Sequence, residues 1–359
     1  MSNPTKFFAD FGNSLHSLAL TEHNTLGLAC QAKRVLTLSS HEQLPILSAL
    51  AREHGGCLVL GGGSNVVLPA RLERLVVQVA LRGILLVEDQ EPSQDEKSAW
   101  RIDVAAGENW HDWVQVATQR GWAGLENLAL IPGTVGAAPV QNIGAYGVEL
   151  QERIESVTAW HIPEGRMVTL TREECDFAYR DSIFKRALPG TWLILSVRFL
   201  LPKAWKPVLT YPDLRHHSVL STLSPSAIRA QQILDAVVEI RRTKLPDPAL
   251  LGNAGSFFKN PVVSDEQYRL LKDTFSDLVA YLQPDGMFKL AAGWLIERCG
   301  WKGKRLGAVG VHERQALVLV NYGGAQAGEL LSLANKVRES VQQQFGVELE
   351  IEPVVVSET

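Results

Sequence analysis

The sequence predicts an α+β protein with more than one domain, and three features of the chain support this class. In the first 220 residues, short β-type runs and single helices follow one another without the regular strand–helix alternation of a parallel sheet. Two glycine-rich loops lie in this part, and the composition changes near residues 221–226. At 359 residues the chain is also longer than one typical domain. We therefore expect a domain at 1–220, with subdomains at about 1–75 and 76–220, and a second domain at 221–359.

The first domain is expected to start with a helix and a strand that lead into a glycine loop. Residues 40–54 are amphipathic and end at a Gly-Gly pair, which is typical of a helix C-terminus. The apolar run Cys57–Leu60 follows as a strand and continues into Gly61–Asn65. The remaining expected elements are strands at 75–79, 100–105, 156–161 and 192–200, a helix at 108–119 and a polar surface loop at 89–98.

The second domain is expected to open with a helix near residue 224. Ser224 suits the N-cap of this helix and Pro225 its first position. An apolar face follows, and a basic run at 241–244 precedes a proline-containing break at 245–248.

The C-terminal end of the chain predicts a helix and then a strand. Residues 328–345 carry apolar side chains at helical spacing and are followed by Gly346. Apolar residues then alternate with Glu348, Glu350 and Glu352, which is typical of a half-buried strand. We expect this last strand to return to the active site.

Composition and charge argue against several classes of partner. The formal net charge is −4, and no long basic run is present, which argues against nucleic acid or an anionic membrane as the partner. The apolar runs are too short for membrane insertion, and the N-terminus lacks a signal-peptide pattern. The four cysteines are scattered and the histidines show no metal-ligand spacing, so we expect no metal and a cytoplasmic location.

The two glycine-rich loops together predict a dinucleotide site. Glycines let a ligand lie directly on the backbone, and successive free N–H groups form an anion-binding nest that suits a pyrophosphate. Gly61–Asn65 is neither a Rossmann fingerprint nor a Walker A loop, because Val66 stands at the third glycine position and no Gly-Lys-Ser/Thr follows. The second loop, residues 124–147, is rich in glycine and nearly free of charge.

Three further residues have both a functional and a structural interpretation. Arg180 lies between aromatic residues, where it is either a solvated surface group or a ligand for a carboxylate. Ser256 stands on a small polar turn, which either enters a buried strand or displays a hydroxyl; the G-x-S-x-G elbow is excluded because Phe258 occupies its last position. Glu352 lies at the end of the last strand, where the chain could enter a site.

These motifs together resemble the UDP-N-acetylenolpyruvoylglucosamine reductase family, in its longer type I form. The resemblance runs from about residue 24 to residue 352. It is carried, in chain order, by Gly61–Asn65, Gly107–Trp110, 124–147, Tyr179–Phe184, Leu209–Leu214, Thr243–Asp247, Gly255–Pro261, Lys289–Ile296 and His312–Leu317.

The resemblance implies a fold and a reaction. It implies an FAD-binding domain of the vanillyl-alcohol-oxidase (PCMH) type with non-covalent FAD, and a C-terminal α+β domain that covers the substrate. NADPH would reduce the flavin, and the hydride would then pass to UDP-N-acetylglucosamine enolpyruvate and give UDP-N-acetylmuramate. This reaction belongs to peptidoglycan precursor synthesis, and thereby to cell wall biogenesis, cell shape, cell division and the cell cycle. We expect a monomer.

The resemblance also implies roles for individual residues. Arg180 and Glu352 would stabilise the enolate-like species, with Glu352 in its protonated form, and Ser256 would donate a proton to the α-carbon. The implied cofactor-binding residues are Gly61, Gly62, Gly63, Ser64, Asn65, Gly133, Thr134, Gly136, Asn142, Gly144 and Tyr146. The implied substrate-binding residues are Tyr211, Lys244, Asn260, Lys289 and Gln315.

The last strand departs from the family pattern and leaves a choice of register. Pro353 stands one place past the key glutamate, and Val354 stands where a basic residue is common in the family. A shift of two residues would assign the catalytic role to Glu350, and we expect Glu352.

Two other functions remain open at this level. The first is another FAD-dependent oxidoreductase of the same fold, an oxidase that tethers its flavin through His or Cys; neither glycine loop contains such a residue. The second is a non-catalytic UDP-sugar-binding protein, which would not need Arg180, Ser256 and Glu352 together.

Overall fold

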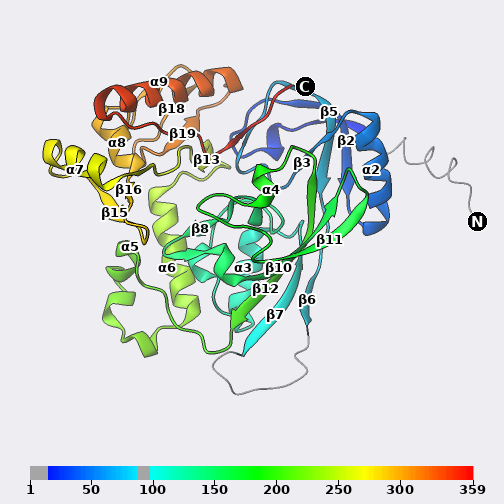
Figure 1. The fold of residues 1–359 in the computed structure, drawn as a ribbon, viewed down its shortest axis with the longest axis horizontal. Helices are drawn as coiled ribbons and strands as arrows, with labels where there is room; N and C mark the ends of the chain where they lie inside the picture. The colour runs from blue at the N-terminus through cyan, green and yellow to red at the C-terminus, as the bar shows by residue number, and fades with distance from the viewer. Residues whose placement is uncertain (1–14, 88–97, 359) are drawn as a thin grey trace, which may run out of the picture.

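The N-terminal part of the chain is built on two β-sheets (Figure 1). The structure is a computed structural model that describes residues 15–87 and 98–358, so the expected surface loop at 89–98 lies almost entirely outside the described residues. The first sheet has the strand order β1-β2-β5-β3, with β2, β5 and β3 parallel and β1 antiparallel. Its strands are β1 (His16–Ala19), β2 (Gln31–Leu38), β3 (Cys57–Leu60) and β5 (Arg71–Val79).

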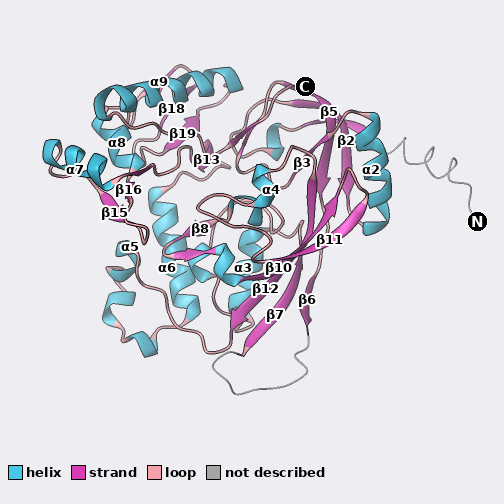
Figure 2. Cartoon of the chain, in the orientation of Figure 1, coloured by secondary structure: helices cyan, strands magenta, loops and turns pink. Residues whose placement is uncertain are grey.

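The second sheet is antiparallel throughout, with the order β11-β10-β12-β7-β6. Its strands are β6 (Ile84–Val87), β7 (Ala99–Ala105), β10 (Ile154–His161), β11 (Arg166–Thr171) and β12 (Trp192–Pro202). The five strands that the sequence predicts in the first domain correspond to β3 and β5 of the first sheet and to β7, β10 and β12 of the second. Each expected end lies within four residues of the observed one. Figure 2 shows the two sheets next to each other, with α2 beside the first sheet and α3 and α6 towards the centre of the molecule.

Helices α2 (Leu44–Glu53) and α3 (Trp110–Gln119) confirm the two helices expected in the first domain. The segment before α2 forms a short 3₁₀ turn over His41–Gln43 instead of helix. Asn109 caps α3 by accepting a hydrogen bond from the Asp112 N–H (3.1 Å). Trp110 and Trp113 are buried against Phe199 of β12, which attaches the helix to the second sheet.

The helix expected from residue 224 begins later than the capping pattern indicates. Ser224 precedes a 3₁₀ turn at Pro225–Ala227, and helix α6 spans Ala230–Lys244. Ile228 follows the 3₁₀ turn in an extended conformation, and its side chain is buried. The burial of this side chain separates the turn from α6, so the helix starts only after it.

Helix α6 packs with the residues that precede it in the chain. Its buried residues Ile233, Leu234, Ala236 and Val237 share one hydrophobic core with the second sheet and α3. The core that contains α8 and α9 takes most of its residues from Ala254 onwards, and Leu26, Leu28 and Val67 of the N-terminal part join it. We therefore propose that the domain boundary lies after α6, at the break 245–248, and not at 220.

The C-terminal part combines two small antiparallel sheets with three helices (Figure 1). The sheet orders are β13-β19-β18-β17 and β14-β16-β15. The strands are β13 (Gly252–Ser256), β14 (Val262–Val263), β15 (Ala280–Leu282), β16 (Phe288–Leu290), β17 (Arg305–Leu306), β18 (Val309–Val311) and β19 (Val318–Asn321). The helices are α7 (Asp265–Thr274), α8 (Ala292–Arg298) and α9 (Ala327–Phe345), the last of which ends at Gly346 as expected.

The last segment returns to the first sheet region, but not as the regular strand that the sequence predicts. Residues 347–350 are extended, and Ile351 forms a single bridge with Phe258. The expected alternation is present, because Val347 and Leu349 are buried while Glu348 and Glu350 are exposed. β20 (Val354–Val355) then pairs in parallel with β4 (Val66–Val67), directly after the first glycine loop. Figure 1 shows this crossing as the red segment beside the blue sheet.

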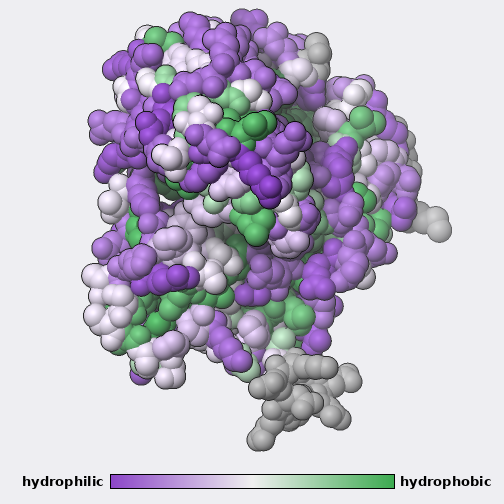
Figure 3. Space-filling view, turned by 60° about the vertical axis from the view of Figure 1, so that its left-hand side comes forward, coloured by the Kyte–Doolittle hydropathy of each residue, from purple (hydrophilic) through white to green (hydrophobic). Residues whose placement is uncertain are grey.

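The face of the molecule drawn in Figure 3 is mostly hydrophilic. Figure 3 shows hydrophobic residues in separate patches on a predominantly hydrophilic face, as is usual for a folded domain. Within the described part of the chain, no helix has the length and apolar character needed to cross a membrane.

Candidate active site

One cavity is lined by both glycine loops, by Arg180 and by residues of α6 and of the C-terminal part. Its volume is about 340 Å³. Residues 58–66 and 131–144 contribute most of its wall, and Arg180, Arg241, Ser256 and Glu352 also line it. The three residues expected to be catalytic therefore lie on one cavity, although they are far apart in the sequence.

The two glycine loops are in direct contact, and two glycines make this possible. A Cβ atom on Gly62 would stand 2.8 Å from Cα of Gly133, and one on Gly61 would stand 2.7 Å from the hydroxyl of Thr134. A Cβ atom essentially never approaches another heavy atom so closely, so a larger residue would push the loops apart. The Ser64 hydroxyl adds a hydrogen bond of 3.0 Å to the carbonyl of Pro132.

Most of the expected cofactor-binding residues line the cavity, and three do not. Gly61, Gly62, Gly63, Ser64, Asn65, Gly133, Thr134 and Gly144 line it. Gly136, Asn142 and Tyr146 lie outside its wall.

Each of these three residues has a structural task. Gly136 packs on Ala106, where a Cβ atom would stand 2.5 Å from the alanine Cβ. Asn142 is fully buried, and its side chain binds the Ala178 carbonyl and the Gln151 N–H (both 3.0 Å). Tyr146 stacks edge-on against Tyr211 with 5.1 Å between the ring centroids.

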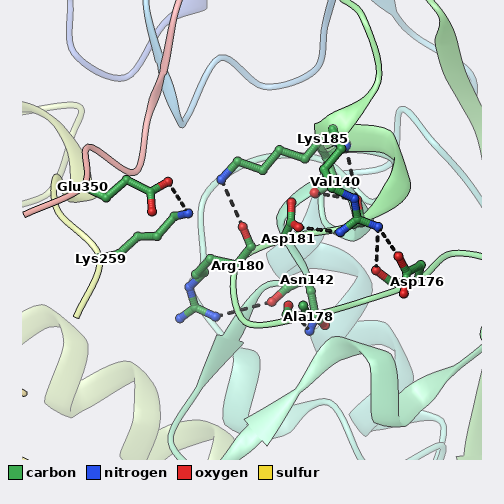
Figure 4. A network of polar contacts seen from close by, with 11 residues as sticks. Val140, Asn142, Asp176, Ala178, Arg180, Asp181, Lys185, Lys259 and Glu350 are labelled. Carbon is green, nitrogen blue, oxygen red and sulfur yellow. Dashed lines mark hydrogen bonds and ion pairs between the residues drawn. The ribbon is translucent and has the colours of Figure 1, made fainter. Parts of the chain in front are cut away.

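Arg180 and Glu352 form an ion pair at the cavity wall. Arg180 Nε lies 3.3 Å from Glu352 Oε1, and the side chains are 19% and 14% exposed. The guanidinium also donates to the carbonyls of Gly144 (2.7 Å) and Asn142 (3.3 Å), as Figure 4 shows for Asn142. Burial raises the pKa of Glu352, and the positive charges of Arg180, Lys185 and Lys259 oppose this shift.

The register of the last segment is fixed by backbone hydrogen bonds. The Glu352 N–H donates to the Phe257 carbonyl (2.9 Å), and the Lys259 N–H donates to the Glu350 carbonyl (3.0 Å). The Asn65 side chain donates to the Glu352 carbonyl (3.4 Å), which ties the segment to the first glycine loop. Glu350 points the other way, to an ion pair with Lys259, as Figure 4 shows. The placement therefore brings Glu352, and not Glu350, to the cavity.

Ser256 is the last residue of β13 and is exposed on the cavity wall. Gly255 before it has φ +66°, and the pairing of β13 with β19 is irregular between Asn253 and Ser256. A bulge of this kind redirects a side chain out of the strand pattern. The turn thus leaves Ser256 on the cavity wall, while Phe257 and Phe258 directly after it are buried. A functional role for the hydroxyl stays a prediction.

None of the five expected substrate-binding residues is part of the cavity wall, and each has contacts elsewhere. Lys244 binds Asp213 (2.6 Å), on the short helix that follows Tyr211. Lys289 Nζ lies 4.8 Å from the ring centroid of Tyr179, the neighbour of Arg180. Asn260 Oδ1 accepts a hydrogen bond from the Ala292 N–H (3.0 Å). Gln315 lies beside Gly293, because a Cβ atom added to this glycine would stand 3.3 Å from Gln315 Oε1.

Arg241 is a cavity residue that the sequence reasoning missed. Burial lowers its pKa, and its Nε has no hydrogen-bond partner among the described atoms. The basic run at the end of α6 was interpreted only as the end of a helix. Neighbouring charged residues on a helix are usually solvated, so no member of the run was expected to be buried. A signal was available in the spacing, since Arg241 follows buried Val237 by four residues and lies on the same face of α6.

Backbone strain gathers around the site. Among the described residues, the non-glycine residues with φ between +43° and +58° are Leu130, Asn142, Tyr146, Asp176 and Arg180. Such conformations are costly and are frequent at functional sites. No cluster of His, Cys, Asp or Glu suited to a metal ion is found in the part of the chain that the structure describes.

Comparisons with known proteins identify the family. Residues 32–171 match the family model for an FAD binding domain, and residues 247–356 match the one for the UDP-N-acetylenolpyruvoylglucosamine reductase C-terminal domain. The chain is 57% identical to the UDP-N-acetylenolpyruvoylglucosamine reductase of Bordetella pertussis, over 93% of this chain and 92% of that one. It is 50% identical to the reductase of Paraburkholderia phymatum, over 99% of both chains.

A solved structure supports the fold. The reductase of Thermus caldophilus, named MurB, superposes with a TM-score of 0.63 at 24% identity and covers 96% of this chain and 99% of its own. The α+β fold with an FAD-binding domain, expected from the sequence, is thereby confirmed. With both parts of the chain matched and full-length relatives at half or more identical residues, the chain belongs to the UDP-N-acetylenolpyruvoylglucosamine reductase family.

Proposed function

We propose that the protein reduces UDP-N-acetylglucosamine enolpyruvate to UDP-N-acetylmuramate, with FAD as its cofactor and NADPH as the hydride donor. The observation that carries this proposal is the meeting of Arg180, Ser256 and Glu352 with both glycine loops on one cavity. Membership of the reductase family supports the substrate and the reaction type.

The residues present fit FAD. Gly61 and Gly62 let the two loops stand in direct contact at the cavity wall, and the backbone N–H groups of such glycine-rich loops suit a diphosphate. The unsatisfied Nε of Arg241 offers a buried donor to a carbonyl or ring nitrogen. When bound, FAD accepts a hydride from NADPH and supplies it to the alkene of the substrate.

Arg180 and Glu352 would stabilise the charge that hydride addition places on the α-carbon and carboxylate of the substrate. The guanidinium is held by two backbone carbonyls and so is aimed before the reaction begins. The raised pKa of Glu352 favours the protonated form, which can donate a hydrogen bond to the developing enolate. Ser256 would then give its proton to the α-carbon, a strongly basic centre.

The five expected residues outside the cavity wall would bind the UDP-sugar. Lys244 and Lys289 suit the diphosphate, because an ammonium group is a compact point charge. Tyr211 would offer the sugar nucleotide an aromatic ring, which Tyr146 contacts edge-on. Of the cofactor-binding set, we now assign Gly136, Asn142 and Tyr146 to shaping the loops. The substrate set is Tyr211, Lys244, Asn260, Lys289 and Gln315.

The proposal places the protein in peptidoglycan precursor synthesis in the cytoplasm, as a monomer. Through that synthesis it would support cell wall biogenesis, cell shape, cell division and the cell cycle. An oxidase with covalent flavin is less well supported, because no described residue lining the cavity is His or Cys.

An absorption spectrum followed by acid precipitation tests the cofactor. We expect the purified protein, as isolated or after addition of FAD, to show a flavin spectrum. Acid should leave the flavin in the supernatant, because the loops hold it without a covalent bond. A flavin that stays with the precipitated chain, or a protein that binds none, contradicts the proposal.

His111 gives this site a predicted pH dependence. Its Nδ1 accepts a hydrogen bond of 3.0 Å from the N–H of Leu130. Leu130 belongs to the second glycine loop and has a positive φ of +58°, so this bond helps to hold the loop in a strained conformation. Burial lowers the pKa of His111 below 6.5; Arg241 and Arg242 add to this shift and Asp112 opposes it. The unprotonated ring therefore contributes fully above about pH 6.5, and its contribution is lost as the pH falls from there through the lowered value.

We expect the Kd for FAD, measured by flavin fluorescence, to rise as the pH falls below this range. His111→Asn keeps an acceptor for Leu130 without a titrating group, so its Kd should be nearly independent of pH. His41→Asn, at an exposed position, is the matched control and should behave as the wild type. An equal pH dependence in wild type and His111→Asn would exclude the role.

A further inference from the structure

The backbone at Arg180 adopts a conformation that residues with a Cβ atom disfavour. Its φ is +54°, and it lies in a tight turn closed by paired hydrogen bonds between Ala178 and Asp181 (3.1 and 3.2 Å). Glycine and asparagine tolerate this region best, and arginine gains nothing from it locally. Contacts from outside the turn must therefore hold Arg180 in this shape.

Lys185 supplies such a contact to the backbone of Arg180. Its Nζ donates a hydrogen bond of 3.0 Å to the Arg180 carbonyl oxygen. Figure 4 shows Lys185 reaching across to this carbonyl, while the guanidinium of Arg180 extends in the other direction, towards Asn142. The two ends of the residue are thus fixed separately, the carbonyl by Lys185 and the side chain by backbone oxygens.

The helix that carries Lys185 is anchored to the cavity wall. α4 spans Ile183–Arg186, and the Ser182 hydroxyl accepts a hydrogen bond from the Lys185 N–H (3.4 Å). The same hydroxyl donates to the carbonyl of Val140 (2.7 Å), a residue that lines the cavity. Lys185, Arg180 and the second glycine loop are therefore tied into one frame.

Lys259 offers a comparison, because it carries the same charge near the same carboxylates. Burial, followed by the charge of Lys259, lowers the pKa of Lys185, whereas Glu352, Glu350 and Asp181 raise it. Both lysines act on the charge of Glu352. Lys259, however, binds Glu350, and its ammonium group is not the one that contacts the Arg180 carbonyl.

We propose that Lys185 is a positioning residue: its hydrogen bond to the Arg180 carbonyl holds Arg180 in the left-handed conformation that aims the guanidinium at Glu352 and the cavity. The inference rests on the proposed function, which assigns Arg180 to charge stabilisation in the hydride-transfer half-reaction. Without this bond the backbone can relax towards negative φ. Because such a change reorients the Cα–Cβ bond, the guanidinium then leaves its place.

The test is Lys185→Met, which keeps an unbranched side chain of nearly the same length and removes the donor. The two half-reactions are followed anaerobically in a stopped-flow instrument with flavin-loaded protein. We expect reoxidation of the flavin by the enolpyruvyl substrate to slow by about 10- to 100-fold, the range found for coupled neighbouring residues. Reduction by NADPH and the flavin content should stay near the wild-type values, which shows that the variant is folded. Lys185→Arg should recover most of the rate, since it restores a donor.

Lys259→Met separates positioning from charge. It removes the same charge near Glu352 but leaves the Arg180 carbonyl bonded, so its reoxidation rate should stay near that of the wild type. Equal slowing in both lysine variants would mean that charge alone matters and would overturn the proposal. A wild-type rate in Lys185→Met would overturn it as well.

A double-mutant cycle shows whether Lys185 acts through Arg180. In an Arg180→Met background, Lys185→Met should have almost no further effect on reoxidation. Effects that multiply would show an independent role for the lysine and contradict the inference. If Arg180→Met alone reoxidises at the wild-type rate, the proposed function fails at Arg180 itself, and this result is distinct from a failure of the lysine.

Discussion

Ser256→Ala is expected to stop the hydride-transfer half-reaction and to leave the reduction of FAD by NADPH nearly unchanged. The hydroxyl is displayed on the cavity wall at the end of β13, in a turn that Gly255 makes possible. Without it, the carbanion-like species formed on hydride addition has no proton donor. General acid catalysis is worth about 10²–10⁴-fold, so reoxidation by substrate should slow by at least this order. Anaerobic stopped-flow absorbance separates the two halves, since bleaching reports reduction and recovery of the flavin band reports hydride delivery.

Ser256→Cys should recover part of the lost rate, because a thiol also donates a proton. Ser332→Ala, at an exposed position of α9, serves as the control and should leave both halves unchanged. If Ser256 only shapes the turn, Ala and Cys should slow both halves alike or reduce flavin content. Wild-type reoxidation in Ser256→Ala would eliminate the proton-donor role.

The second large effect is expected for Glu352→Gln, whereas Glu350→Gln should be nearly silent. Both substitutions keep the shape of the side chain and remove its ionisable group. Glu352 is buried beside Arg180, and its acid form can stabilise the enolate-like species, so its loss should slow turnover by about 10²–10³-fold. Glu350 is exposed and paired with Lys259, and exposed ion pairs contribute little.

Steady-state kcat with saturating NADPH and substrate is the measurement, and Glu350→Gln is the matched control two residues away. The pH profile gives a second readout, because the raised pKa of Glu352 keeps the acid form present at higher pH than for an ordinary glutamate. The part of the pH profile of kcat that reflects the titration of Glu352 should be absent in Glu352→Gln. If Glu350→Gln is the damaging change, the assignment across Pro353 is wrong.

Local patterns were sufficient for much of the fold. The strand at Cys57–Leu60 and the helix over 327–345 follow from apolar periodicity and from the glycines that end each element. The start of α6 did not follow, because Ser224 and Pro225 are a good capping pair locally, while the burial of Ile228 decides where the helix can begin. The packing of α6 on the second sheet is likewise a long-range contact that its own sequence does not encode.

The sequence likewise pointed to some residues of the candidate site and not to others. Gly62 and Arg180 could be singled out because their residue type is unusual for their setting, and the family resemblance then suggested roles. Residue type alone did not single out Arg241 and Lys185, since each looks like an ordinary basic residue at a helix end; for Arg241 only its spacing from Val237 pointed to the buried face of α6. Their importance comes from burial beside the cavity and from a bond to a strained carbonyl, both of which exist only after the chain has folded.

The central claim is that this cavity transfers a hydride from NADPH, through FAD, to an enolpyruvyl ether of a UDP-sugar. The most direct measurement is a single turnover: flavin-loaded protein is bleached with one equivalent of NADPH without oxygen and is then mixed with UDP-N-acetylglucosamine enolpyruvate. The account predicts that the flavin band returns and that one equivalent of UDP-N-acetylmuramate forms per flavin, identified by mass spectrometry. A flavin that stays bleached, or that returns without this product, would contradict it.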